Sequence, residues 1–225
     1  MKRRTTSAIV GAAIFIAVMA LFTAASWADQ SLVYGSAEGS TVRVDGTSTA
    51  HDWTVKGRQI DGTIEFHVAL PSGATREQIK DALVANPRAV AQVAIPARTL
   101  KSGKKDMDKK TFEALKTGKY PEIVYKLGEV EVVGGGGRAR TSFQLHTTGE
   151  LTIAGFTRTL EMPMTIEVLD ERRLRISGRT AIRMSDYRVA RPQAMGGLIK
   201  AGDKVEVEVA WVVATAEPAA TVAKD

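Results

Sequence analysis

The chain has 225 residues, no cysteine and a formal net charge of +6 at pH 7. The missing cysteines exclude disulfides, cysteine-based metal sites and a thiol nucleophile. Hydrophobic residues make up 44% of the chain, which is ordinary for a globular protein and excludes a fibrous or disordered one.

Residues 1–28 have the three parts of a secretory signal peptide. Lys2–Arg4 is basic, Ala8–Phe22 has no charge, and Ser26–Ala28 places small residues where signal peptidase cleaves. We expect cleavage after Ala28 and a periplasmic or secreted mature protein. The alternative is an uncleaved membrane anchor, because the apolar stretch is close to the length of a membrane span.

Loss of the signal peptide changes the charge of the protein. It lowers the number of basic residues from 31 to 28 against 25 acidic residues, a net charge of +3. These charges alternate in sign along the chain, which is typical of a solvated surface. We therefore expect no nucleic-acid binding.

The first part of the mature chain shows short two-residue repeats. Residues 29–40 have little periodicity, and we expect a loose lead-in there. Beyond them, apolar and polar residues alternate, as in strands with one buried face and one solvated face. Strands are predicted at Thr41–Asp45, His51–Lys56, Ile64–Leu70 and Ala89–Ile95. Turns are predicted at Asp45-Gly46 and Asp61-Gly62.

Two short helices are expected between the strands. The first spans Thr75–Ala85, with Thr75 as N-cap and Gln78 three residues on. The second spans Asp108–Lys116, with two apolar residues, at positions 112 and 115, on one face.

The basic run Lys101–Lys110 precedes the second helix. Its sequence, KSGKKDMDKK, is typical of a solvated loop. The alternative is contact with anionic lipid headgroups, worth up to about 1 kcal/mol for each cation near a membrane surface.

The strongest pattern is a long hairpin from Arg138 to Val168, which follows a four-glycine loop at Gly134–Gly137. Apolar residues occupy odd positions as far as Ile153 and even positions from Leu160 onward. The phase changes around Gly155, because glycine tolerates the positive φ of a tight hairpin turn. Both arms exceed the usual strand length of about five or six residues.

The rest of the chain completes a set of eight or nine strands. Strands are expected over Leu174–Met184 and Val205–Val213, joined by an irregular connection over residues 185–202 and followed by a flexible tail, residues 216–225. Most of these strands follow one another directly in the chain, and their apolar residues change between odd and even positions from one strand to the next. We therefore predict an all-β fold: an up-and-down antiparallel barrel of about eight strands with two short helical inserts, in one domain over residues 41–215.

Several segments together resemble the YceI-like family of exported, lipocalin-like barrels. In chain order they read FEALKTGKYPEIVYKL, GELTIAGFTRTLEMPMTI, LRISGRTAIRMSDYRV and AGDKVEVEVAWVV. Gly149–Arg158 is similar to the hallmark hairpin of that family, Lys119–Ile123 to its segment after the second helix, and Ser48–Trp53 to its N-terminal motif. The resemblance covers residues 41–214.

This sequence departs from the family pattern in two places. Arg188 stands where the family has a glycine, and the segment from Ala94 to Lys105 is more basic than usual. Both departures concern the shape of the ligand site more than the fold.

The resemblance implies a binding protein without catalytic activity, since the best-understood members hold polyisoprenoid chains. It implies a hydrophobic amphiphile such as an isoprenoid or quinone-like lipid as the ligand, and no other cofactor. Apolar side chains would line the interior, and residues of the second helix and the long connection would line or cover its mouth. The expected ligand-binding residues are Trp53, Phe66, Phe143, Leu145, Met162, Met164, Met184 and Trp211 inside, with Phe112, Leu115, Tyr187, Met195 and Leu198 at the mouth.

Other functions and partners are also considered. A fully packed structural or interaction protein of the cell envelope, acting under stress or in adhesion, is the main alternative. A hydrolase using His51 and Asp52 is a third hypothesis, although no nucleophile motif accompanies them. His51, His67 and His146 lie on different expected strands, so no metal site is expected. Transient contact with a membrane surface and a homodimer are further expectations.

Overall fold

The structure is a computed structural model that describes residues 31–68, 70, 73–135 and 141–215. The expected signal peptide, residues 1–28, and the expected tail, residues 216–225, lie outside the described residues. The strands are β1 (Ser31–Ser36), β2 (Thr41–Ser48), β3 (Trp53–Gly57), β4 (Asp61–His67), β5 (Ala89–Pro96), β6 (Glu122–Gly135), β7 (Ser142–Ile153), β8 (Phe156–Val168), β9 (Arg173–Arg183), β10 (Gln193–Ala194) and β11 (Ile199–Thr215). The helices are α1 (Arg76–Ala85) and α2 (Lys105–Ala114), with 3₁₀ turns η1 (Ala97–Thr99), η2 (Met184–Tyr187) and η3 (Met195–Gly197).

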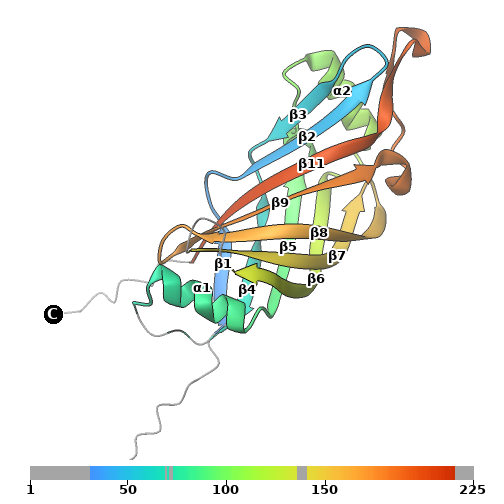
Figure 1. Ribbon diagram of the computed structural model, residues 1–225. Coiled ribbons are helices and arrows are strands. Elements are labelled where there is room, and N and C mark those ends of the chain that lie inside the picture. The colour runs from blue at the N-terminus through green and yellow to red at the C-terminus, as the bar shows by residue number, and fades with distance from the viewer. Residues whose placement is uncertain (1–30, 69, 71–72, 136–140, 216–225) are drawn as a thin grey trace, which may run out of the picture.

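Eight of the strands close into an antiparallel barrel (Figure 1). The ring runs β1-β4-β5-β6-β7-β8-β9-β11 and returns to β1, where Tyr34 pairs with Thr215. Strands β4 to β9 are neighbours in chain order, so most of the wall is a meander. The predicted barrel of about eight strands with two short helices is confirmed.

The first strand of the ring was not expected. The prediction of a loose lead-in over residues 29–40 is wrong for Ser31–Ser36, which pair with β4 on one side and β11 on the other. Tyr34 is only 1% exposed, and its ring packs edge-on against Phe66 with the ring centroids 6.0 Å apart. One large buried side chain fixes this strand, but it gives no repeat that sequence periodicity can detect.

Strands β2 and β3 form a hairpin that extends the wall beside the first part of β11. Because β11 is 17 residues long and β1 pairs only with its last residues, β2 pairs with the stretch from Ala201 to Ala210. The outer edge of β3 is joined to the segment after β5 by two backbone hydrogen bonds of 2.9 Å between Lys56 and Lys101. The wall is therefore continuous on this side as well.

Neither predicted Asp-Gly turn is a turn in the structure. Asp45-Gly46 lies inside β2, where Gly46 pairs with Trp53 and a Cβ on Gly46 would lie 2.2 Å from the indole ring. Asp61-Gly62 begins β4. In the first case, glycine serves close packing of an aromatic ring across two strands, a role that looks like a turn signal in the sequence.

The long central hairpin is confirmed as β7 and β8. Its turn consists of Ala154 and Gly155, with φ values of 50° and 83°. Positive φ at both central residues matches the right-handed twist of the strands on either side. Upstream, β6 continues to Gly135 and takes in part of the glycine run that was expected to be a loop.

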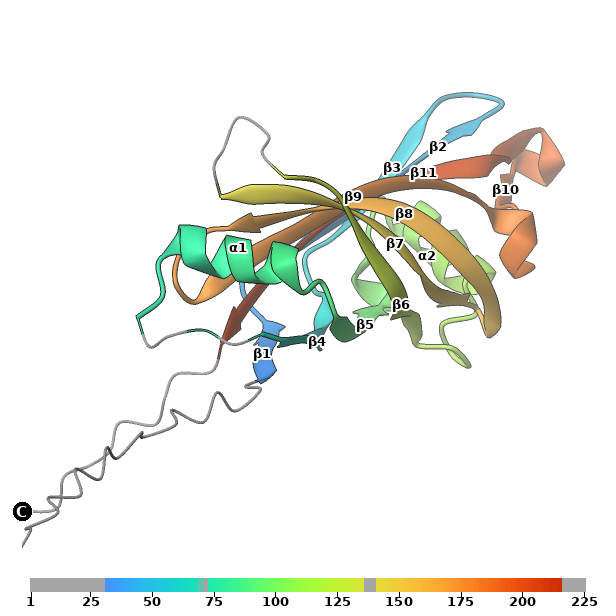
Figure 2. The same ribbon diagram turned by 60° about the horizontal axis from the view of Figure 1, so that its bottom comes forward.

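The two helices lie at opposite ends of the barrel (Figures 1 and 2). Helix α1 is firmly held, because Thr75 and Gln78 form the predicted capping box and Ile79 and Leu83 are buried. Helix α2 has no side-chain N-cap and no fully buried residue.

Helix α2 begins at Lys105, three residues before the predicted start, so the second half of the basic run is helical and not a loop. Asp106 and Asp108 lie in its first turn, where a negative charge favours the helix. Asp108 also accepts hydrogen bonds of 2.6 Å from the backbone N–H and the hydroxyl of Ser102. Among the described residues, no helix is long and apolar enough to cross a membrane.

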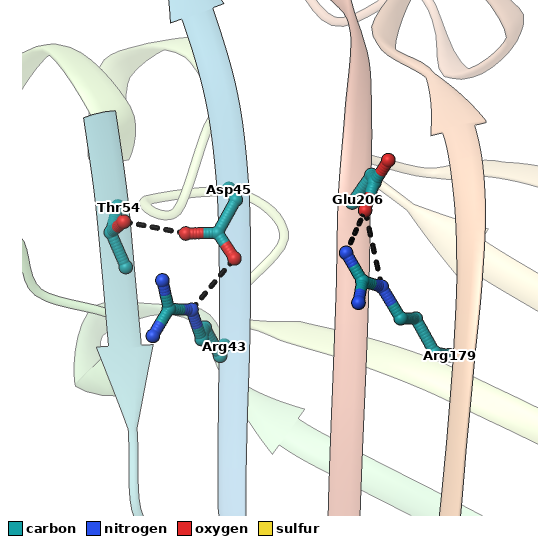
Figure 3. Close-up of polar contacts among 5 residues, drawn as sticks. All are labelled: Arg43, Asp45, Thr54, Arg179 and Glu206. Atoms are coloured by element: carbon teal, nitrogen blue, oxygen red, sulfur yellow. Dashed lines mark hydrogen bonds and ion pairs between the residues drawn. The ribbon is translucent and has the colours of Figure 1, made fainter. Parts of the chain in front are cut away.

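The outer face of β2, β3, β9 and β11 carries ordered ionic contacts (Figure 3). Asp45 accepts hydrogen bonds from Arg43 at 2.7 Å and from the Thr54 hydroxyl at 2.5 Å. Arg179 pairs with Glu206 on the neighbouring strands. The polar residues that make these contacts lie on the solvent side of each strand, and the alternate apolar residues point into the interior.

We expect the Asp45→Asn variant to be slightly less stable than the wild type at neutral pH only. The hydrogen bond from Arg43, with that from Thr54, lowers the pKa of Asp45. A lowered folded-state pKa stabilises the protein above the unfolded value, about 3.9, and this contribution is lost as the pH falls through the folded value. Because both side chains of the ion pair are partly exposed, the difference should be about 0.5 kcal/mol at pH 7. Urea unfolding of both proteins between pH 7 and pH 2.5 measures it, and a difference independent of pH would contradict this explanation.

Candidate ligand-binding cavity

The interior of the barrel contains a cavity lined mostly by apolar side chains. About 230 Å³ of it is open to the centre of a water molecule. By the same measure, a single buried water needs only about 10–15 Å³. Well-packed interiors contain few voids larger than a water molecule, so this space is a built cavity and not a packing defect.

Most of the residues predicted to contact a ligand do line this cavity. Their side chains come from strands on all sides of the wall and from the segments at one end, because the apolar phase of each strand points inward. The lining members of the predicted set are Trp53, Phe66, Leu115, Leu145, Met162, Met164, Met184, Tyr187 and Trp211.

Four residues of the predicted set lie elsewhere. Phe143 is 2% exposed and lies in the hydrophobic core, in one cluster with Ile79 and Leu83 of α1, but it does not line the cavity. Phe112 lies on the opposite side of α2, in an external groove. Met195 and Leu198 are 71% and 78% exposed at the η3 turn, so they do not cover a mouth of this cavity.

The sequence prediction missed the aliphatic part of the lining. Apart from three leucines it selected aromatic and methionine side chains, whereas valine, isoleucine and further leucine residues make up much of the wall. Examples are Val44, Val93, Ile95, Leu127, Val207 and Val209. The two-residue repeat that identified the strands also marks these residues, so the signal was present in the sequence.

The two ends of the cavity differ. At one end, α2 contributes Thr111 and Ala114 to the lining, together with its C-cap residue Leu115, and η2 contributes Met184 and Tyr187. At the other end, α1 packs against β7 and β8, and none of its described residues lines the cavity. The α1 end is therefore filled with side chains, and the cavity extends toward α2.

The turn at η2 is fixed by a polar clamp. Asp203 of β11 accepts hydrogen bonds from the Ser185 backbone N–H at 2.9 Å and from its hydroxyl at 2.7 Å, and these bonds lower the pKa of Asp203. Arg188 follows with a φ of 50°. Glycine, which the family resemblance leads us to expect at this position, would suit this left-handed backbone conformation. The clamp holds Met184 and Tyr187 against the cavity.

A few hydroxyl-bearing residues interrupt the apolar lining, namely Thr111, Tyr125, Thr147, Thr180 and Tyr187. Tyr125 of β6 lines the cavity, and its buried hydroxyl has no hydrogen-bond partner of good geometry among the described residues. Burial raises the pKa of Tyr125, and the nearby Thr147 hydroxyl opposes this rise. Thr147 already donates to the Met162 carbonyl oxygen at 2.9 Å. The Tyr125 hydroxyl is thus packed within the barrel wall, over Gly149 and near Thr147.

The residues of the hydrolase hypothesis build a turn outside the cavity. His51 and Asp52 are exposed. The Ser48 hydroxyl accepts from the His51 backbone N–H at 3.1 Å and donates to the His51 carbonyl at 2.6 Å, which closes the loop between β2 and β3. Within the described part of the chain, no three His, Asp or Glu side chains are grouped to hold a metal ion.

Solved structures share this architecture at low sequence identity. BcnA from Burkholderia cenocepacia matches with a TM-score of 0.56 and 17% identity, over 77% of this chain and 95% of that one. A polyisoprenoid binding domain from Saccharophagus degradans, implicated in plant cell wall breakdown, matches with a TM-score of 0.57 and 12% identity, over 83% of this chain and 100% of that one. At these identities, the likeness shows the fold alone.

The sequence itself carries the family assignment. None of the curated proteins matches the chain. The profile of the YceI-like domain, in contrast, matches residues 34–213, from β1 to β11. Because this match takes in the whole closed ring and most of the chain, the protein belongs to the YceI-like family.

Proposed function

We propose that this protein binds a polyisoprenoid or a similar long-chain amphiphile in its barrel and sequesters or transports it. The apolar cavity inside the barrel is the observation that carries the proposal. Each methylene removed from water contributes about 0.8 kcal/mol, so a prenyl chain needs no charged anchor. Family membership and the polyisoprenoid-binding description of one structural neighbour support the same class of ligand.

The lining suits such a ligand in detail. Met162, Met164 and Met184 are unbranched and adapt to an irregular hydrocarbon chain. The open interior argues against the alternative of a fully packed envelope protein.

The proposed place of action is the periplasm. Residues 1–28 have the composition of a signal peptide, which supports export and cleavage after Ala28. A long-chain isoprenoid is almost insoluble in water, so a carrier between membranes must enclose most of its chain. A closed barrel with an apolar interior meets that requirement.

The test is to extract the natively expressed protein with organic solvent and to analyse the extract by mass spectrometry. We expect one lipid with a long hydrocarbon chain for each protein chain. In a second arm, lipid-free protein should take up a prenyl quinone from solution with one-to-one stoichiometry. Finding neither a stoichiometric lipid nor uptake would refute the proposal.

A further inference from the structure

A basic groove runs along the outer side of α2, close to the cavity end that α2 covers. Its cationic residues are Arg98, Lys101, Lys105, Lys109, Lys116 and Lys119. Its acidic residues are Asp108 and Glu113, so the groove has an excess of positive charge even though the mature chain as a whole is nearly balanced.

The positive charge of the groove is not neutralised internally. No ion pair involves these six cations within the described part of the chain. Asp108 is engaged by Ser102. The guanidinium of Arg98 lies 5.9 Å from the centroid of the Phe112 ring, which holds it at the groove surface. The groove therefore presents fixed positive charge to an outside partner.

Helix α2 separates this groove from the cavity. Thr111, Ala114 and Leu115 line the cavity, whereas Lys105 and Lys109, one turn apart, face the groove. The helix has no fully buried residue and no side-chain N-cap, unlike α1 at the closed end. A partner bound in the groove thus lies one helix away from the ligand chain, against the less firmly held end of the barrel.

We propose that this groove docks the barrel on the anionic surface of a lipid bilayer, with the α2 end facing the membrane. The partner is inferred from complementary charge and from the apolar cavity directly behind the groove. A bilayer supplies both matching elements, a negatively charged surface and hydrocarbon chains beneath it. This inference rests on the proposed function, because docking has a purpose only if the ligand is exchanged with a membrane.

The experiment compares two double variants with the same change in net charge. In Lys105→Glu/Lys109→Glu, both substitutions lie in the groove. In Arg88→Glu/Lys126→Glu, both lie on exposed positions of the barrel outside it. Because a glutamate near the N-terminus of α2 suits the helix dipole, the groove variant should remain folded, and circular dichroism verifies this.

Binding is measured by co-sedimentation of the mature protein with vesicles of phosphatidylglycerol and, separately, of phosphatidylcholine. Each cation near an anionic surface strengthens binding about fivefold, so the groove variant should bind phosphatidylglycerol vesicles about 25-fold more weakly or worse. The wild type should bind phosphatidylcholine poorly and should lose its binding to phosphatidylglycerol as salt is added. The control variant should lose less than about fivefold, because its cations lie outside the contact.

Three outcomes would overturn the proposal: equal losses of vesicle binding in the two variants, equal binding of the wild type to both lipids, or tighter salt-dependent binding of the wild type to a DNA duplex than to vesicles.

Uptake of a prenyl quinone, measured without vesicles, separates this proposal from the proposed function. If the wild type takes up the quinone but the groove variant still binds vesicles normally, only the docking surface is refuted. If the wild type takes up no quinone, the proposed function itself fails.

Discussion

Replacing Thr180 with phenylalanine should remove most of the ligand affinity while the barrel remains folded. Thr180 lies on β9 and lines the cavity, so a phenyl ring there occupies space that a hydrocarbon chain would fill. If the ring displaces about four methylenes at about 0.8 kcal/mol each, the affinity for a prenyl quinone falls about 200-fold. Titration of lipid-free protein with the quinone, followed by tryptophan fluorescence, measures the change.

The adjacent residue provides the control for this experiment. Ala181 lies on the same strand but faces solvent. An Ala181→Phe variant adds the same ring outside the barrel, so its affinity should stay within about twofold of the wild type, in line with the small effects usual for surface substitutions. Equal affinity of the Thr180→Phe variant and the wild type would show that the ligand does not occupy the cavity.

Replacing Gly149 with valine should lower the stability of the protein more than either the Asp45→Asn or the Gly35→Val substitution. Gly149 lies on β7, and a Cβ there would come within 2.4 Å of the Tyr125 hydroxyl and 2.5 Å of the Lys126 carbonyl oxygen. A carbonyl in a paired strand cannot move aside without breaking the ladder. We expect the free energy of unfolding, measured with urea, to fall by about 3 kcal/mol or more.

A second glycine in a strand serves as the comparison. Gly35 on β1 has no atom within 4 Å of its ideal Cβ position. Valine at that position meets no obstacle and favours an extended backbone, so the stability should change by less than about 1 kcal/mol. If Gly149→Val were as well tolerated as Gly35→Val, the close packing of β6 on β7 would not matter for stability.

The closed barrel could be predicted because long two-residue repeats mark most of its wall. A repeat of this kind requires only the alternating directions of side chains along a strand, and each predicted strand shows it. The repeat is too short to identify β1, where Tyr34 is buried and Leu32 is partly buried. The Asp45-Gly46 pair is misleading because Gly46 packs beneath the Trp53 ring and makes no turn.

The candidate site was only partly predictable for a different reason. The two-residue repeat of a strand indicates which side chains point inward, but it does not indicate how far along the barrel axis each of them lies. Phe143 is therefore buried in the core but does not line the cavity. Similarly, the helical repeat placed Phe112 and Leu115 together, whereas the packing of α2 turns Leu115 inward and Phe112 toward the groove.

The pairing of β1 with β11 also bears on how the protein folds. Tyr34 and Thr215 are adjacent in the wall but 181 residues apart in the chain. Contacts between such distant residues are slow to form, because a long loop must close before they can contribute to stability. The edges of β1 and β11 remain unpaired until the final strand is available. Until the last strand pairs, the barrel is therefore open along this seam, and its unpaired strand edges are vulnerable to aggregation.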